Sequence, residues 1–346
     1  MGMKGERARR LEDIARRCGV SISSVSRALN NRPGVSAETR RRVLSVAGEQ
    51  GFRPRARKRH LSRAMLDLLL VVPEREELSA NPFLNISELV GAIGEAFRDE
   101  KKRVEVVPVG DFADSIGDGA PGVDGVLFAY RSVGEKERKR LMDTKIPYVF
   151  ISRVIPGENY VSCNYYKSML GLTRMMIESG HRRLGYLGNR GNPNDIDRLR
   201  GFKTAVTESG VEHSVYARVD TIFGVDERVA GVFTDGRCDA VLCFNDFMAI
   251  RLIGNLRDLG CAVPDDMSVT GFDDSPLRRA AAPFLTTVRQ PAFEMAFLAS
   301  RWLRDNILNK TNRRLCIEVE GEVVFGESTL MRGGIRNRHR EHTRTP

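Results

Sequence analysis

Apolar residues near the start of the chain recur at the spacing of an α-helix. Leu11, Ile14, Ala15 and Cys18 fall at i, i+3, i+4 and i+7, which lays one apolar stripe along a short helix. Gly19 interrupts this pattern, because glycine favours turns over helix interiors. The spacing therefore predicts a short helix followed by a tight turn.

A second helix is predicted directly after this turn. Ser21 can accept a backbone N–H at the helix start, and Val25, Ala28 and Leu29 provide an apolar stripe to bury. Two short helices joined by a glycine turn form a helix-turn-helix. An ordinary helical hairpin with a polar surface is the alternative interpretation.

A third helix is expected over residues 36–50. Ser36 can open it, and Val43, Leu44 and Ala47 are expected to point inward. Three helices this short need a shared core to be stable, since each alone is marginal in water. The sequence therefore predicts one compact all-α unit at the N-terminal end.

The second helix also has a face that the apolar stripe leaves exposed. This face carries Ile22, Ser23, Ser26 and Arg27, so it offers one apolar contact, two hydroxyls and one guanidinium. An arginine side chain fits the paired acceptors of guanine in the major groove of DNA. The face is therefore a candidate for reading DNA bases.

From residue 66 the pattern changes to apolar runs of buried-strand type that alternate with helical stretches. The helical stretches run from about Phe83 to Asp99, from near Tyr165 to Ser179, from around Arg198 to Gly210, and up to Gly260. The strand runs are LDLLLVVP, VEVVPV, GVLFAY, YVFI, RLGYLGN, DAVLCFND and SVTGFDD. This alternation predicts parallel sheets covered by helices on both faces, with enough units for two lobes. Ligands of such sheets bind beyond the carboxyl ends of the strands.

Charge is distributed unevenly along the chain. Residues 1–63 contain seventeen Lys or Arg and five Asp or Glu, a formal charge of +12, whereas the remainder carries about −2. Local positive charge beside a helix-turn-helix is typical of a protein that contacts the phosphate backbone of DNA. A membrane surface is a weaker alternative, because the basic run has no broad apolar face to insert.

Composition excludes several other classes of protein. The chain has 346 residues and 41% apolar content, which suits two to three domains. It has no apolar run of membrane-spanning length and no secretory signal, so we expect a cytoplasmic protein. The six cysteines lack metal-ligand spacing, which predicts reduced core residues. We therefore expect no metal, no cofactor, no catalytic residues and no membrane partner.

Several motifs occur together in a fixed order. They are LEDIARRCGVSISSVSRALN, VSAETRRRV, GFRP, VDGVLF, SGHRRLGYLG, RLRGF, CFNDFMAIRLIGNLRDLG, VPDDMSVTGFDDSPL and LTTVRQP. In order and spacing, over nearly the whole chain, they resemble the LacI-type (LacI/GalR family) bacterial transcriptional regulators. The resemblance implies an all-α helix-turn-helix DNA-binding domain, a hinge helix, and a periplasmic-binding-protein-like α/β core of two Rossmann-like lobes, which the chain crosses between three times.

The same resemblance implies domain boundaries. The helix-turn-helix domain would cover residues 1–54, the hinge helix or linker 55–64, and the effector-binding and dimerisation core 65–346. Within the core, lobe one would comprise about 65–163 and 292–311, and lobe two about 164–291 and 312–332.

The positions that bind DNA in this family can be matched to residues of this chain. On the exposed face of the second helix, Ile22, Ser23 and Arg27 match positions that read bases, and Ser26 matches a phosphate contact. In the basic hinge, Arg57 and Lys58 are expected to contact DNA, although a plain solvated linker is the alternative. Leu61 matches the hinge leucine that is wedged into the minor groove, where it partly unstacks a base step.

The effector cleft can be matched in the same way. Arg198, Asn245 and Asp273 match residues that line the cleft in the family. A guanidinium and a carboxylate in one cleft suit hydroxyl-rich ligands, because each can engage two neighbouring oxygens. Ser152 and Asn164 stand where Asp is common in the family, so the effector is expected to be less typical than a neutral sugar, or absent.

The resemblance implies a sequence-specific transcriptional regulator and no enzyme. It would be a repressor, or else an activator, whose affinity for a pseudo-palindromic double-stranded operator is controlled by a small molecule such as a sugar or sugar derivative. It would act as a homodimer or a higher oligomer, in the bacterial cytoplasm and in association with the nucleoid. The alternative is a cytoplasmic sugar-binding or sugar-converting protein with a basic N-terminal arm, but such a protein needs neither the helix-turn-helix nor its charge.

Overall fold

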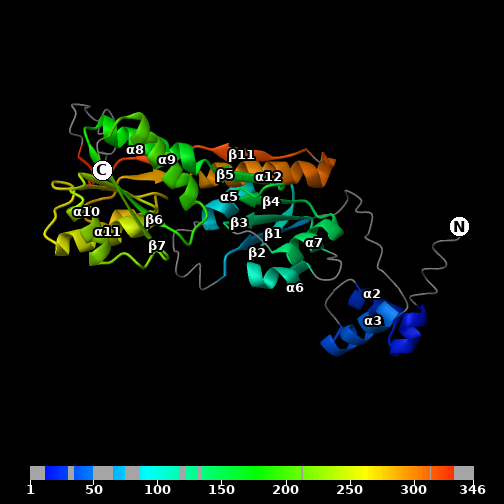
Figure 1. The fold of residues 1–346 in the computed structure, drawn as a ribbon. Helices are drawn as coiled ribbons and strands as arrows, with labels where there is room; N and C mark the ends of the chain where they lie inside the picture. The colour runs from blue at the N-terminus through cyan, green and yellow to red at the C-terminus, as the bar shows by residue number, and fades with distance from the viewer. Residues whose placement is uncertain are drawn as a thin grey trace, which may run out of the picture.

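The computed structural model contains a small helical unit near the N-terminus and a larger α/β core (Figure 1). It describes residues 12–29, 35–49, 65–74, 86–116, 122–130, 134–211, 213–311 and 313–330. The basic hinge at residues 55–64 lies outside these ranges. Among the described residues, no helix is long and apolar enough to cross a membrane.

The helical unit has the three predicted helices. Residues 12–18 are helical, and α2 (Ile22–Leu29) and α3 (Ala37–Glu49) follow. Gly19 has a φ of 60°, which is the left-handed region that glycine adopts without steric cost. The shared core consists of Ile14, Ala15, Cys18, Val25, Ala28, Leu29, Val43 and Ala47. The expectation for Leu44 is wrong, because this side chain is 48% exposed.

Serine side chains begin both α2 and α3, as predicted. The hydroxyl of Ser21 accepts a hydrogen bond from the backbone N–H of Ser24 at 3.1 Å, and that of Ser36 accepts one from Thr39 at 3.2 Å. Each hydroxyl satisfies a helix N–H that has no partner within the helix. The sequence therefore sets the starts of these helices locally.

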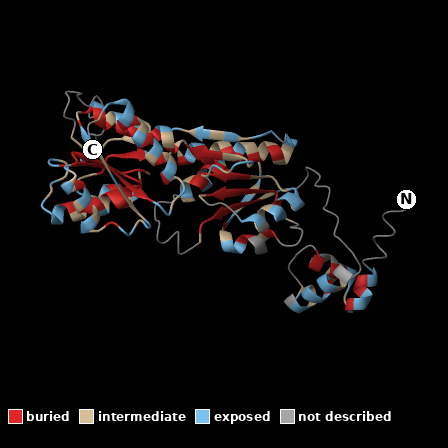
Figure 2. Cartoon of the chain, viewed as in Figure 1, coloured by how far each residue is buried: buried red, intermediate tan, exposed pale blue. Residues whose placement is uncertain are grey.

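The first lobe of the core is built on a six-stranded parallel sheet with the order β11-β5-β4-β3-β1-β2. Its strands are β1 (Leu66–Val72), β2 (Lys102–Pro108), β3 (Gly125–Ala129), β4 (Tyr148–Ile151), β5 (Tyr160–Cys163) and β11 (Cys316–Val319). Its helices are α5 (Ile86–Ala96), η1 (Val109–Asp111), α6 (Phe112–Ile116), α7 (Glu135–Thr144) and α12 (Ala292–Asn309). Leu68 and Leu70 of β1 pack in the cluster that contains α5 and α12, whereas Leu69 and Val71 pack with α6 and α7. Both faces of the sheet are therefore buried (Figure 2).

The second lobe has a four-stranded parallel sheet with the order β7-β6-β8-β9. Its strands are β6 (Arg183–Asn189), β7 (His213–Val219), β8 (Ala240–Cys243) and β9 (Ser268–Thr270). Its helices are α8 (Tyr165–Glu178), α9 (Asp195–Glu208), α10 (Glu227–Asp235), α11 (Asp246–Asp258) and η3 (Pro276–Ala280). Side chains of β8 alternate in the same way, with Leu242 in the cluster of α8 and α9, and Val241 in that of α10 and α11.

The structure corrects three expectations, one about topology, one about a helix start and one about cysteine burial. Residues 312–319 were expected in lobe two, but β11 pairs with β5 and extends the sheet of lobe one. Only after β11 does the chain form β12 (Glu322–Val324), which pairs antiparallel with β10 (Thr287–Arg289). Helix α9 begins at Asp195 rather than at Arg198. Not all cysteines are core residues, because Cys316 is exposed and Cys261 is half-buried.

Candidate functional site

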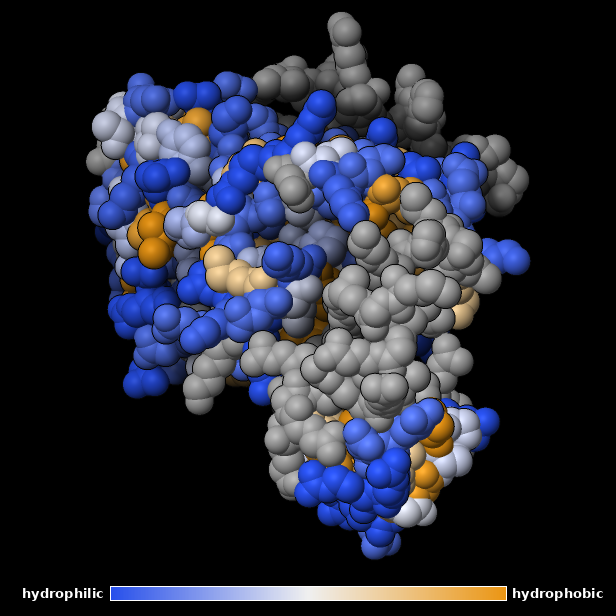
Figure 3. All heavy atoms as spheres, turned by 90° about the vertical axis from the view of Figure 1, so that its right-hand side faces the viewer, coloured by the Kyte–Doolittle hydropathy of each residue, from blue (hydrophilic) through white to orange (hydrophobic). Residues whose placement is uncertain are grey.

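The predicted DNA-reading face lies on the solvent side of α2. Ile22 is 46% exposed, and Ser23 and Arg27 are exposed as well. The hydroxyl of Ser23 is hydrogen-bonded to that of Ser21 at 2.8 Å, so the turn positions it. The side chain of Ser26 lies outside the described residues. The view of this end of the molecule shows hydrophilic side chains on the described part of the helical unit, with a smaller group of hydrophobic ones beside them (Figure 3).

Arg57, Lys58 and Leu61 lie outside the described residues. Their assignments to phosphate contacts and to the minor-groove wedge therefore stay predictions.

Four of the five effector residues predicted from the sequence, namely Ser152, Arg198, Asn245 and Asp273, line a cavity of about 1080 Å³. Both lobes line it, largely with the residues that directly follow the parallel strands, as the sheet rule predicts. Lobe one, including the first residue of α12, contributes Pro73, Glu88, Tyr130, Ser152, Arg153, Val154, Ile155, Pro156 and Ala292. Lobe two and the adjoining chain contribute Tyr165, Asn189, Gly191, Asn192, Pro193, Asn194, Arg198, Thr221, Ile222, Phe223, Phe244, Asn245, Asp273, Asp274, Ser275, Pro276, Arg279, Arg289 and Gln290.

Arg198 and Asp273 are brought together in the cavity wall, as expected. Arg198 is 2% exposed, and its Nη2 donates to Oδ1 of Asp273 at 3.4 Å while its Nη1 donates to the carbonyl of Phe244. Three aromatic rings surround the guanidinium carbon, at 4.8 Å for Tyr165, 4.2 Å for Phe244 and 3.9 Å for Phe272. Its buried Nε has no hydrogen-bond partner among the described residues. The two hydrogen bonds and the three rings thus hold the guanidinium in place.

Asp273 sits at a strained position that exposes its carboxylate to several donors. Its φ is 122°, which side chains rarely adopt, and such strain is typical of functional sites. Gln290 also donates to Oδ1 of Asp273, at 2.6 Å. Burial raises the pKa of the Asp273 carboxyl, and the charge of Arg198 partly opposes that rise. Tyr130, Ser152 and Asp274, which also line the cavity, have positive φ values too.

A second carboxylate, that of Asp246, is hydrogen-bonded to segments that form this wall. Asp246 is buried at the start of α11, where it accepts hydrogen bonds from the backbone N–H of Ser275 at 2.6 Å and from the hydroxyl of Thr287. Burial, and then the negative charge of Asp273, raise the pKa of Asp246 to about 7. Gly271 allows this approach, because any side chain there would collide with the Asp246 carboxylate.

Asn245 lines the cavity and also begins α11. Its Oδ1 accepts a hydrogen bond from the backbone N–H of Met248 at 2.9 Å, so the amide oxygen caps the helix. The Nδ2 of the same amide remains to donate to a ligand. Asn245 is therefore both a structural cap and a cavity residue, and the two roles use different atoms.

The two positions expected to replace a family aspartate have different outcomes. Ser152 lines the cavity, and its hydroxyl is hydrogen-bonded to that of Tyr165 at 2.7 Å. Asn164 does not line the cavity, because its side chain caps α8 by accepting from the backbone N–H of Lys167 at 2.9 Å. The expected cleft position of Asn164 is wrong, and a capping signal before a helix could have shown it.

Sequence reasoning missed other polar residues of the cavity. Arg153 donates to the carbonyl of Tyr130 at 3.0 Å and to the side chain of Asn194 at 3.2 Å, so it connects the two lobes. Asp274 accepts from Arg289 at 2.6 Å, and also from Arg278 at 2.5 Å. Arg153 and its partners come from distant segments, which no local pattern marks, whereas Arg278 is only four residues from Asp274.

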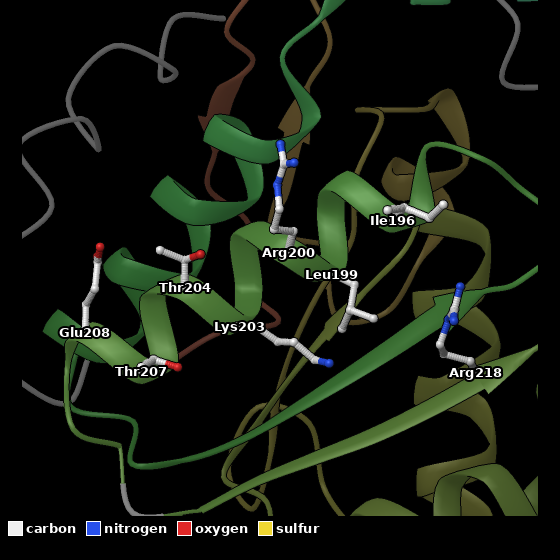
Figure 4. Close-up of a pocket in the computed structure, with 8 residues that line it drawn as sticks. All are labelled: Ile196, Leu199, Arg200, Lys203, Thr204, Thr207, Glu208 and Arg218. Atoms are coloured by element: carbon white, nitrogen blue, oxygen red, sulfur yellow. The ribbon is translucent and has the colours of Figure 1, made fainter.

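A second hollow, of about 510 Å³, lies on the outer side of α9 (Figure 4). Seven of its eight lining residues belong to that helix, and Arg218 of β7 is the eighth. Figure 4 shows that Arg200 and Lys203 point to different sides of the helix. Because these side chains do not converge, this hollow is a poor candidate for the effector site.

Comparisons with known proteins agree with this architecture. The profile described as "Bacterial regulatory proteins, lacI family" matches residues 10–55, and the profile "Periplasmic binding protein-like domain" matches residues 173–329. The transcriptional regulator GalR of Escherichia coli is 31% identical over 307 residues, which is 84% of this chain and 87% of GalR. The chain belongs to the LacI family.

Other members of the LacI family are similar over most of their length. The regulator MalR of Streptomyces coelicolor is 31% identical over 322 residues, covering 86% of this chain and 90% of MalR. The solved complex of the transcriptional regulator CelR with cellobiose has a TM-score of 0.65 at 26% identity, covering 92% of this chain and 99% of CelR. This LacI-family protein is thus a transcriptional regulator with a helix-turn-helix domain and a two-lobed core.

Proposed function

We propose that this LacI-family regulator is a homodimeric repressor of the bacterial cytoplasm, whose affinity for its operator is controlled by a hydroxyl-rich effector bound in the 1080 Å³ cavity. The observation that carries this proposal is the presence, in one chain, of an exposed DNA-reading face and a cavity with a fixed guanidinium–carboxylate pair. A two-fold symmetric dimer requires two half-sites, so the operator is pseudo-palindromic.

The α2 helix reads the operator in this proposal. Arg27 hydrogen-bonds a base edge, Ile22 and Ser23 make the neighbouring base contacts, and Ser26 contacts a phosphate. Arginine provides specificity here because its fork matches the O6 and N7 acceptors of guanine. The remaining positive charge of residues 1–63 supplies non-specific attraction to the duplex.

The hinge completes the contact with DNA. Arg57 and Lys58 neutralise phosphates, and Leu61 enters the minor groove at the operator centre. Unstacking a base step costs a few kcal/mol, which is offset by the contacts that the bent duplex permits.

The effector contacts Arg198, Asp273, Asn245 and Ser152. The related CelR protein was solved with cellobiose, which supports a carbohydrate-type ligand for a cavity of this kind. A sugar-binding or sugar-converting protein without DNA binding is the rival, but the family match to residues 10–55 favours the regulator.

Selection of bound sequences from a random DNA pool tests the proposal. We expect the full chain to enrich a pseudo-palindromic site and to bend it, as measured by fluorescence energy transfer. Leu61→Ala should lose bending and specific affinity together, while non-specific binding and its salt dependence persist. If no site is enriched, the regulator proposal is wrong; if Leu61→Ala bends the site fully, only the wedge assignment is wrong.

A further inference from the structure

A run of hydrogen bonds joins the two lobes through the hydroxyl of Tyr165. Tyr165 is the first residue of α8, and its hydroxyl is bonded at 2.7 Å to that of Ser152, which follows β4. The same hydroxyl contacts Oε1 of Gln290 at 3.3 Å, and Nε2 of Gln290 donates to Oδ1 of Asp273 at 2.6 Å. All four residues line the effector cavity. The run therefore connects a hydroxyl of lobe one with the carboxylate of lobe two along the wall of the site.

The carboxylate oxygen at one end fixes the direction of every hydrogen bond in this run. Oδ1 of Asp273 accepts from both Arg198 and Gln290, so the amide of Gln290 turns its N–H toward Asp273 and its oxygen toward Tyr165. An amide oxygen can only accept, so the single proton of the Tyr165 hydroxyl is donated to Gln290. Tyr165 then has no proton left for Ser152, and Ser152 donates its own proton to Tyr165. The opposite direction would leave two oxygens facing each other at 3.3 Å without a proton between them.

The direction of the run decides what Ser152 offers to a ligand. A serine hydroxyl has one proton and two lone pairs, and in this run the proton is directed at Tyr165. Ser152 is 3% exposed and lines the cavity, and its backbone N–H donates to the carbonyl of Val161 at 2.8 Å, so its position is fixed. What remains for a ligand is a lone pair of Oγ. Ser152 therefore faces the effector as an acceptor only, like a carboxylate oxygen but without the charge.

The ring of Tyr165 is held by contacts that do not involve its hydroxyl. Its centroid lies 4.8 Å from the guanidinium carbon of Arg198 and 6.1 Å from the ring centroid of Phe272, and the residue is 4% exposed. Burial raises the pKa of the Tyr165 hydroxyl to about 12, so this group keeps its proton at neutral pH. Replacement by phenylalanine therefore removes the hydroxyl and leaves the packing of the ring.

We propose that Tyr165 is a positioning residue of the effector site, which makes Ser152 a hydrogen-bond acceptor only, so that the effector places a hydroxyl donor against Ser152. A ligand that presents an ether oxygen or a carbonyl there would set two acceptors against each other, which costs free energy. Tyr165 thus determines specificity through Ser152, without donating to the ligand itself. The inference rests on the proposed function, since it specifies one contact of the effector in the same cavity.

Isothermal titration of the full chain with sugars and their fluorinated analogues tests this inference. Ribose, glucose, galactose and cellobiose are compared first, and the tightest binder is then replaced by its monodeoxyfluoro analogues, because fluorine cannot donate a hydrogen bond. At one ring position the analogue should bind the parent chain about tenfold more weakly than the sugar, since a buried acceptor loses its donor. This ratio should approach one in Ser152→Ala, which identifies the position that contacts Ser152. If no ratio depends on Ser152, the inference is overturned.

Tyr165→Phe separates a positioning role from a merely structural one. In this variant Ser152 regains a proton that it can donate, so the ratio at the identified position should fall to about threefold or less, while the ratios at other positions stay. Gln290→Met should lower the same ratio, because Tyr165 can then donate to Ser152, and it decides the matter if Tyr165→Phe does not fold. Tyr148→Phe is the matched control, since it loses a hydrogen bond of 2.8 Å to Glu158 outside the cavity and should change no ratio. Weaker binding of sugar and analogue alike, with the ratio unchanged, overturns the proposal.

Operator binding measured in parallel separates this inference from the proposed function. If the chain selects an operator but binds none of the four sugars, the regulator stands and the inference about Ser152 and Tyr165 falls. If it binds a sugar with the expected ratios but selects no DNA sequence, the proposed function falls and the contact at Ser152 stands.

Discussion

The DNA-reading helix and the effector cavity place functional side chains in opposite settings. On α2, the residues proposed to read bases lie within residues 22–27 and are exposed, while Val25 and its neighbours hold the core. In the cavity, Arg198 and Asp273 are 75 positions apart and are fixed by mutual contacts in a buried wall. Function and stability are therefore separable in the helical unit and shared in the cavity.

Arg198→Ala should have the largest effect and tests the shared role directly. Removing one partner of a buried ion pair costs about 3–5 kcal/mol, because the other charge is left uncompensated. We expect the free energy of unfolding of the core to fall by this amount and the ligand response to be lost, with operator affinity retained. Denaturant unfolding and calorimetry measure both, with Arg228→Ala as the exposed control. If Arg198→Ala is as stable as the parent, Arg198 does not combine a functional with a stabilising role in the cavity.

The buried Asp246 should make the stability of the core depend on pH. Its pKa is raised from 3.8 to about 7, so the folded chain keeps a proton that the unfolded chain releases between these values. The free energy of unfolding should therefore fall as pH rises from about 4 to about 7, by up to about 1.4 kcal/mol per unit.

Unfolding of the parent and of Asp246→Asn across this pH range checks the prediction. The variant should show a flatter profile, because an amide does not titrate. Parallel profiles for the two proteins would assign the pH dependence to other groups.

Arg27→Ala should separate function from stability in the helical unit. Loss of a bidentate base contact is expected to cost about 1–3 kcal/mol on the operator and less on random DNA. The exposed side chain supports no core contact, so the free energy of unfolding should change by no more than about 0.5 kcal/mol. Titrations on both DNAs decide it, and equal losses on the two would make Arg27 a phosphate contact.

The smallest effect is expected at Leu44. This side chain is 48% exposed, so Leu44→Ala should change the stability of the helical unit by less than about 0.5 kcal/mol. The adjacent Val43 is fully buried, and Val43→Ala should cost about 2 kcal/mol. Thermal unfolding measures the loss of stability in each variant. A loss in Leu44→Ala larger than about 0.5 kcal/mol would indicate that Leu44 is buried in an interface.

Much of the cavity follows from motifs that the sequence displays. Arg198, Asn245 and Asp273 stand in RLRGF, CFND and GFDD, and the structure brings all three to one wall. The sequence does not mark Asp246, because its pKa is raised by burial and by the charge of Asp273, which only the tertiary structure brings together. Local capping explains Asn164 better than its alignment with a family position does.

The sequence by itself determined the elements whose stabilising contacts are local. The glycine turn, the serine caps and the burial of β1 on both faces all follow from residues within a few positions of one another. Only the tertiary structure decided that β11 returns to lobe one, that Arg153 reaches Asn194, and which charges of the cavity neutralise one another. These contacts join segments far apart in the chain, and their energies depend on distance and burial, which no local pattern specifies.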